Sequence, residues 1–239
     1  MATARDWLAA SGASEADLRC GSHMPYADDA RDALVRAGEA PCQLHNNCSG
    51  KHAGFIALSR HLRAGPDYVE IDHPVQRAVR EATEAVCGED AAGWAVDGCS
   101  APNFAVSLGG LARGMARFAA PAGDARGRAM TALRDAMMAH PALVAGTGRA
   151  CTDLMDACAG RAAVKTGAEA VFVAILPERG LGVAVKIADG GTRAAEAVIA
   201  ALLVRLGALP AEAEVARRLT EGPIRNRRGI VTGGIEVTL

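Results

Sequence analysis

The segment CQLHNNCSGKHAGFI, residues 42–56, gathers polar and reactive side chains directly before an apolar repeat. The apolar residues recur at helical spacing, at Phe55, Ile56, Leu58 and Leu62. This pattern predicts a loop over residues 45–50 and a helix that begins near Lys51. A helix start offers free backbone N–H groups and a positive dipole end to an anion or a thiolate. We therefore expect Cys48, Lys51 and His52 to lie together at one site.

Gly50 and Lys51 invite comparison with a phosphate-binding loop. That motif requires a glycine at the position of His45 and a serine or threonine at the position of His52. Because both positions differ, the sequence excludes this class of nucleotide-binding site.

The amino-acid composition and net charge indicate which kinds of binding partner to expect. Hydrophobic residues make up 50% of the 239 residues and charged residues 22%, with a formal net charge of −1. This balance argues against nucleic acid, an acidic membrane surface and disorder, and favours a small neutral or zwitterionic partner. Residues 1–7 lack the apolar run of a signal peptide, and no apolar stretch approaches the roughly 20 residues of a membrane span. We expect a cytoplasmic protein with no nucleic-acid or membrane partner.

The usage of cysteine and lysine is informative. Seven cysteines, an odd number in a long chain, suit free thiols or metal ligands better than a secreted disulfide framework. Only three of the 26 basic residues are lysine, namely Lys51, Lys165 and Lys186. A chain that uses arginine almost everywhere is expected to keep lysine where the amine must lose its proton. We assign this role to Lys51 and Lys165, whereas Lys186 is equally well explained by chance.

The first part of the chain reads mainly as helices. Periodicity and end signals predict helices over residues 2–11, 26–40, 51–62, 74–87, 108–119 and 125–139, and a further helix that ends near Gly160. Asp72 is expected to cap the helix of residues 74–87. Residues 94–96 form a short apolar run that predicts a strand, which would place Asp97 and Cys99 at its end.

The pattern changes after residue 161. β-Branched runs at residues 162–164, 170–175 and 181–187 predict an antiparallel meander, with Lys165 at the end of the first strand. Helices are expected over residues 192–206 and 210–219, and a last strand over residues 229–239. The prediction is an α/β (α+β) fold with helices packed on a mainly antiparallel sheet. We expect one domain of residues 1–239, with possible lobes at 1–160 and 161–239.

Several chemistries remain open from the residues alone. Cys48, Lys51 and Cys99 could bind zinc, with Lys51 as a neutral amine, a histidine or water completing a tetrahedral site. Alternatively the cysteines are small buried hydrophobic residues. Cys48 could also be a nucleophile whose pKa is lowered by the helix start and by Lys51, with His52 as the base. Asp97 could be a turn residue, or it could orient a water or a substrate amine.

Seven short motifs occur in a characteristic order and cover nearly the whole chain from Arg19. They are Asn47-Cys48-Ser49-Gly50-Lys51-His52, Asp72-His73-Pro74, Asp97-Gly98-Cys99, residues 140–149, residues 164–168, residues 185–190 and Thr232-Gly233-Gly234. This order resembles the asparaginase II family, the Rhizobium-type L-asparaginases. The resemblance implies hydrolysis of L-asparagine to L-aspartate and ammonia, a serine β-lactamase/glutaminase-like fold, a homodimer and a zinc site near the substrate.

The resemblance also implies roles for single residues. Cys48, Lys51 and Cys99 match the metal ligands of the family. His52 and Asp97 match residues of the substrate site. Lys165 matches the lysine of a Ser-Lys pair, which in the family takes the proton of the serine nucleophile.

The sequence departs from the family at the nucleophile. Family members carry a Ser-x-x-Lys motif in a segment ahead of the part that matches here, so we expect this chain to be N-terminally truncated. Cys48, Ala162 and Val183 stand three residues before the three lysines, and no Ser-x-x-Lys exists in the chain. Three hypotheses follow: an asparaginase-type amidohydrolase that is inactive or impaired, a non-catalytic zinc- or amino-acid-binding homologue, and a cysteine hydrolase that uses Cys48.

Overall fold

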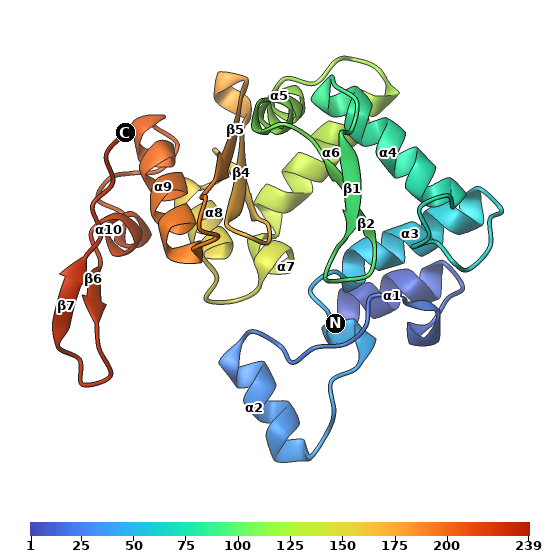
Figure 1. Ribbon diagram of the computed structural model, residues 1–239, viewed down its shortest axis with the longest axis horizontal. Helices are drawn as coiled ribbons and strands as arrows, with labels where there is room; N and C mark the ends of the chain where they lie inside the picture. Colours follow the sequence, from blue (N-terminus) through green and yellow to red (C-terminus); the bar gives the residue numbers. More distant parts are fainter. The chain divides into compact units, whose positions relative to one another are not determined.

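A computed structural model describes residues 1–239, which form two compact units, residues 1–106 and 107–239 (Figure 1). The helices of residues 108–158, which the sequence grouped with the first lobe, belong to the same unit as the late sheet. The prediction of a single domain over residues 1–239 stays a prediction. None of the helices combines the length and the apolar run that a membrane span requires.

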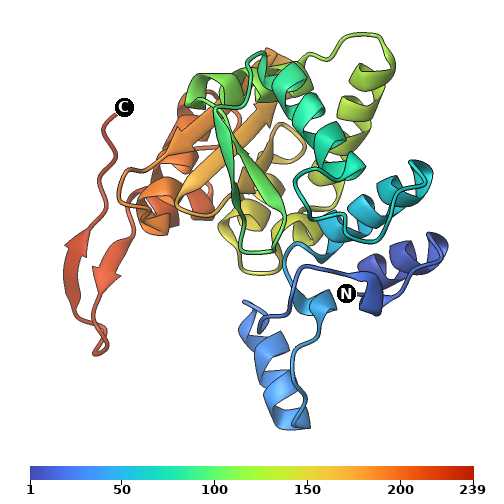
Figure 2. The same cartoon turned by 45° about the vertical axis from the view of Figure 1, so that its right-hand side comes forward.

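The first unit is built mainly from helices. Its elements are α1 (Ala2–Ala10), η1 (Glu15–Asp17), α2 (Asp28–Ala37), η2 (Gln43–His45), α3 (Ser49–His61), α4 (Pro74–Cys87), β1 (Gly93–Val96) and β2 (Pro102–Ala105). Helix α3 packs against both α1 and α4 (Figure 2). The core of this unit includes Leu8, Ile56, Tyr68 and Val75, all 5% exposed or less.

The sequence predicted most helices and strands of this unit close to their observed positions, with two corrections. The N-cap of α4 is His73, whose Nδ1 accepts a hydrogen bond from the Val75 N–H at 3.2 Å, so Asp72 is not the cap. The predicted strand at residues 94–96 is β1, but it pairs antiparallel with β2 in a hairpin that the sequence did not reveal. A four-residue strand that starts at Pro102 gives little periodic signal. Cys99 therefore lies in a hairpin turn.

The second unit contains the predicted meander. Its elements are α5 (Leu108–Ala119), α6 (Ala125–Ala139), α7 (Pro141–Ala145), α8 (Ala150–Cys158), β3 (Ala163–Thr166), β4 (Val171–Leu176), η3 (Pro177–Arg179), β5 (Leu181–Lys186), α9 (Thr192–Arg205), α10 (Glu214–Thr220), β6 (Pro223–Arg225) and β7 (Val231–Gly234). The strand order β3-β4-β5 is antiparallel throughout, as the sequence predicts. The last strand was predicted over residues 229–239, whereas β7 covers only Val231–Gly234, and its pairing with β6 was not predicted.

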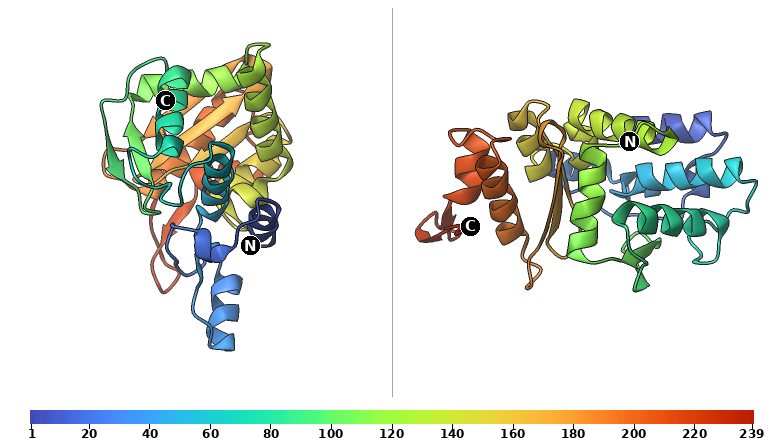
Figure 3. Two further views of the ribbon diagram at one scale, coloured as in Figure 1. Left: turned by 90° about the vertical axis from the view of Figure 1, so that its right-hand side faces the viewer. Right: turned by 90° about the horizontal axis from the view of Figure 1, so that it is seen from above.

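Helices cover both faces of this sheet (Figure 3, right). Because successive side chains of a strand point to opposite faces, Val164 and Phe172 pack with α8 and α9. Ala163 and Ile175 pack instead with α5 and α6. The mixed fold of helices on an antiparallel sheet is confirmed.

The close approach of α5 to β5 depends on Gly182. A Cβ atom at this position would meet backbone atoms of Ala112, Met115 and Ala116 in α5. Backbone atoms cannot move aside as a flexible side chain can. Helix α5 and strand β5 can therefore approach this closely only because residue 182 has no side chain.

We predict that Gly182→Ala destabilises the protein by about 3 kcal/mol, at the upper end of the usual cost of overpacking. The measurement is the midpoint of urea unfolding. Gly93→Ala is the matched control, because a Cβ atom on Gly93 meets nothing within 4 Å. Equal midpoints for the two variants would contradict the described contact of α5 with β5.

Candidate functional site

A buried amide fixes the loop that leads into α3. Asn46 is 6% exposed; its Nδ2 donates to the Cys20 carbonyl at 2.8 Å, and its Oδ1 accepts from the Cys48 N–H at 2.7 Å. His45 assists through Nδ1, which accepts the Cys42 N–H at 3.0 Å. These bonds make Cys48 the N-cap of α3. Sequence reasoning missed Asn46, because an asparagine in a polar loop gives no sign that it will be buried.

The hairpin turn supplies the other half of the cluster. The Asp97 N–H donates to the Ala101 carbonyl at 2.9 Å, and the Ser100 N–H donates to the Asp97 carbonyl at 2.8 Å. Within the turn, Asp97 Oδ1 accepts the Gly98 N–H at 2.8 Å. The second oxygen, Oδ2, remains available to the groups around Cys99.

Residues far apart in the chain meet here. Lys51 Nζ lies 3.0 Å from Cys99 Sγ and 3.4 Å from Asp97 Oδ2. Cys99 Sγ is also 3.4 Å from Asp97 Oδ2. The donor atoms of Cys48, Asp97 and Cys99 all lie within 4.8 Å of one another. The predicted proximity of Cys48, Lys51 and Cys99 is therefore present, and Asp97 belongs to the same cluster.

The cluster has donors that suit zinc. With Zn–S bonds of about 2.3 Å, two thiolates on one tetrahedral ion lie about 3.8 Å apart. That spacing is compatible with the separation of the Cys48 and Cys99 sulfur atoms, and a carboxylate oxygen from Asp97 is an additional ligand of a type that zinc accepts. Cys99 is 3% exposed, whereas the Lys51 and Asp97 side chains are 39% and 33% exposed, so the cluster is open on the side of these two residues.

The two thiols have opposite acidities. The pKa of Cys99 is strongly lowered from its ordinary value of 9.0, by a hydrogen bond from Cys48 and further by the His52 and Lys51 side chains, against the effect of burial. The pKa of Cys48 is strongly raised, by the same hydrogen bond and by burial. The pair therefore shares one proton, which resides on Cys48. This direction is the opposite of the one expected if Cys48 were an activated nucleophile.

Lys51 keeps its proton in this environment. Burial lowers the pKa of Lys51, but the hydrogen bond to Cys99 and the nearby negative charges outweigh it, and the net shift is upward. A lysine that binds a metal must be deprotonated. Lys51 can thus act as a ligand only if the ion displaces its proton, whereas Asp97 requires no such step.

His52 points into the core of the first unit. The side chain is fully buried at 0% exposure, and its Nδ1 lies 3.0 Å from the Tyr68 hydroxyl. His52 still reaches the cluster, since it contributes to the lowered pKa of Cys99. Sequence reasoning missed Tyr68, which gives no local signal because its partners lie 16 and 49 residues away.

Lys165 lies in β3 of the second unit. Its Nζ donates to the Thr166 carbonyl at 2.7 Å, and the residue is exposed although Ala163 and Val164 beside it are buried. A lysine becomes a base through desolvation or a neighbouring cation. The second unit alone therefore does not supply the desolvation expected for Lys165.

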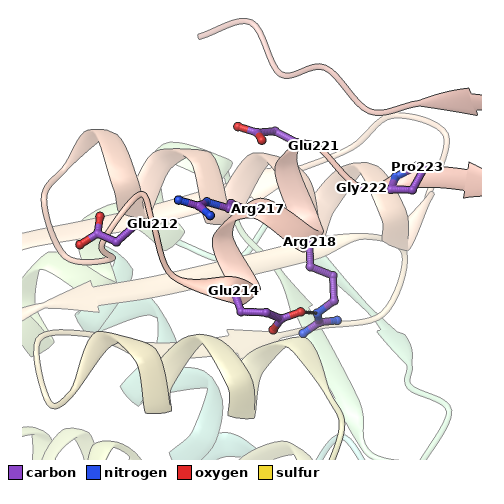
Figure 4. A pocket seen from close by; sticks show the side chains of 7 residues that line it. All are labelled: Glu212, Glu214, Arg217, Arg218, Glu221, Gly222 and Pro223. Carbon is purple, nitrogen blue, oxygen red and sulfur yellow. Dashed lines mark ion pairs between the residues drawn. The ribbon is translucent and has the colours of Figure 1, made fainter.

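A shallow pocket elsewhere carries none of the predicted site residues. It lies over α10 and the start of β6 and is lined by Glu212, Glu214, Arg217, Arg218, Glu221, Gly222 and Pro223 (Figure 4). Arg218 already pairs with Glu214 at 3.4 Å and with Asp153 at 2.6 Å. The cluster around Cys99 is therefore the better candidate site.

The family model described as L-asparaginase II matches residues 1–237 of this chain. No curated protein matches the chain significantly.

We predict that the metal-free protein holds one thiolate at neutral pH, because the lowered pKa of Cys99 keeps it ionised as the pH falls below 9.0. Lys51→Met removes the ammonium 3.0 Å from the sulfur and should raise the pKa of Cys99. The ultraviolet thiolate absorbance should then be lost at a higher pH than in the wild type. Lys186→Met is the control, since the exposed Lys186 donates to a backbone carbonyl and not to a thiol. Identical titration curves for all three proteins would contradict the described pairing.

Proposed function

This chain belongs to the L-asparaginase II family, and we propose that it is an asparaginase-type amidohydrolase whose substrate is L-asparagine. The observation that carries the proposal is the family match over residues 1–237. The cluster of Cys48, Lys51, Asp97 and Cys99 supports it, because four groups with metal-binding or amine-binding chemistry meet in one unit. The reaction would convert L-asparagine and water into L-aspartate and ammonia.

We propose zinc as the ion of this cluster, with Cys48, Lys51 and Cys99 as ligands. The Asp97 carboxylate, 3.4 Å from both Lys51 Nζ and Cys99 Sγ, either joins them or receives the ammonium group of the substrate. A bound zinc ion would supply Lewis-acid polarisation of a carbonyl group. His52 belongs to the substrate side of the proposal, as a buried group next to Cys99.

Lys165 is the proposed catalytic base, and its surroundings limit the hydrolytic activity that we expect. No serine stands three residues before Lys165 or before either of the other lysines. Lys165 is also exposed, so burial does not provide the desolvation that a catalytic amine requires. We therefore propose that this polypeptide by itself hydrolyses L-asparagine poorly.

A second function, binding of zinc or an amino acid without turnover, is favoured by one observation. The clustered donors Cys48, Asp97 and Cys99 all lie in the first unit, and two thiols and a carboxylate are ligand types that zinc accepts. The third alternative, a cysteine hydrolase using Cys48, is less well supported, because the raised pKa of Cys48 keeps its thiol protonated.

The assembly and location of the protein are also proposals. The homodimer rests on the family resemblance alone. A cytoplasmic location is supported by the seven cysteines, which are all free, because cytosolic proteins keep their thiols reduced.

We predict that Co²⁺, used as a spectroscopic substitute for zinc, gives thiolate-to-metal absorption bands with the wild-type protein. Cys48→Ser and Cys99→Ser should each weaken these bands and lower the affinity by at least tenfold, since each removes one soft ligand. Cys42→Ser is the matched control, because Cys42 is a half-buried cysteine of the same core cluster and is not among the clustered donors. Bands that survive both single substitutions would argue against this site.

We predict negligible release of ammonia from L-asparagine by the 239-residue polypeptide. Loss of the nucleophile from a serine-base pair typically costs on the order of 10⁴-fold or more in rate. Calorimetry with L-asparagine should still detect weak binding that Asp97→Asn reduces. Robust hydrolysis that Cys48→Ser abolishes and Lys165→Arg preserves would instead establish the cysteine hydrolase.

A further inference from the structure

A buried hydrogen-bond chain leads from the backbone of residue 19 to the candidate site. The Arg19 N–H donates to the Tyr68 hydroxyl at 2.8 Å. The same hydroxyl lies 3.0 Å from His52 Nδ1. Tyr68 is 1% exposed and His52 is 0% exposed, so water does not compete for these groups.

The direction of the second bond follows from the first. A backbone N–H can only donate, so the Tyr68 oxygen accepts from Arg19. The phenol has a single proton, and His52 Nδ1 is the acceptor within reach. Burial raises the pKa of Tyr68 well above its ordinary value, so the phenol keeps this proton. His52 Nδ1 is therefore an acceptor, and the neutral ring must carry its own proton on Nε2.

The second ring nitrogen of His52, Nε2, is the polar atom that the bond to Tyr68 leaves over. Nε2 is fully buried and makes no hydrogen bond of good geometry within the protein. Buried polar groups are almost always satisfied, so an unsatisfied one needs an explanation. With Nδ1 bonded to Tyr68, Nε2 is the ring nitrogen left to act on Cys99, whose lowered pKa includes a contribution from the His52 side chain.

Packing around the two rings prevents either from turning away. Phe55 lies at an edge of His52 with centroids 5.4 Å apart, and its ring centroid is 6.0 Å from that of Tyr68. The backbone of Tyr68 is fixed as well, since Gln76 Nε2 donates to its carbonyl at 2.7 Å. Gln76 is itself fully buried, so this anchor is inside the core of the first unit.

We propose that Tyr68 is a positioning residue that fixes the proton of His52 on Nε2, so that His52 serves the cluster as a hydrogen-bond donor and not as a general base. A ring whose Nδ1 is occupied by the phenol proton and whose Nε2 is protonated has no free lone pair to accept a proton. The role of this donor toward a substrate rests on the proposed function, whereas the tautomer itself does not.

The experiment is ring ¹⁵N NMR of the metal-free protein, with His52 assigned through the His52→Gln variant among the six histidines. The wild type should show an unprotonated Nδ1 and a protonated Nε2, with a slowly exchanging Tyr68 hydroxyl proton coupled to Nδ1. In Tyr68→Phe the two ring shifts should move toward each other, because the tautomers then interconvert. The chain contains only one other tyrosine, the exposed Tyr26, and Tyr26→Phe should leave the shifts of His52 unchanged.

A protonated Nδ1 in the wild type, or a missing coupling to the Tyr68 hydroxyl, would overturn the proposal even if Tyr68→Phe fails to fold. Unchanged His52 shifts in a folded Tyr68→Phe would overturn it equally. Binding of L-asparagine separates the proposed asparaginase function from the proposed tautomer of His52. His52→Gln retains a donor close to the Nε2 position and should keep the affinity for L-asparagine within a few-fold of the wild type. His52→Asn places no donor there and should lower the affinity at least tenfold. No binding by any variant, together with the expected spectrum, would reject the asparagine function and leave the tautomer established.

Discussion

The candidate site depends on one proton that two cysteines share. Cys48 and Cys99 come from a helix start and a hairpin turn, and the structure places their sulfur atoms within 4.8 Å of each other. Two thiolates this close would repel each other, so one stays protonated. The hydrogen bond from Cys48 is the main cause of the lowered pKa of Cys99, and His52 and the Lys51 ammonium 3.0 Å away contribute further. The surrounding bonds of Asn46 and of the turn at Asp97 serve this arrangement, because they hold the two chain segments in place.

The charges of the cluster explain how metal binding and protonation compete. With Cys48 protonated, the Cys99 thiolate, the Asp97 carboxylate and the Lys51 ammonium leave a net charge of −1. A divalent ion that takes both sulfur atoms and the amine must displace the proton of Cys48 and that of Lys51. Its affinity therefore increases with pH. The open side, where Lys51 and Asp97 are 39% and 33% exposed, lets these protons leave to solvent.

Periodicity was sufficient for most of the fold. The helices and the β3-β4-β5 meander have runs long enough to show a period, and they lie close to where the sequence placed them. The partner strands β2 and β6 have four and three residues and begin at a proline, so pairing alone defines them. Residue types and spacing made Cys48, Lys51 and Cys99 candidate ligands, and the resemblance assigned their roles. Tyr68 and Asn46 were missed because what identifies them is a bond to a residue distant in sequence.

The same features that assemble this cluster make its cysteines poor nucleophiles. The sulfur that ionises, Cys99, is 3% exposed and receives hydrogen bonds that stabilise its charge, which lowers its reactivity toward a carbonyl carbon. The more accessible sulfur, Cys48, retains its proton. His52 cannot remove that proton if its Nδ1 accepts the Tyr68 hydroxyl and its Nε2 is already protonated. Thiols in this state are suited to binding a metal ion, and that argues for the first unit as a binding and orienting structure.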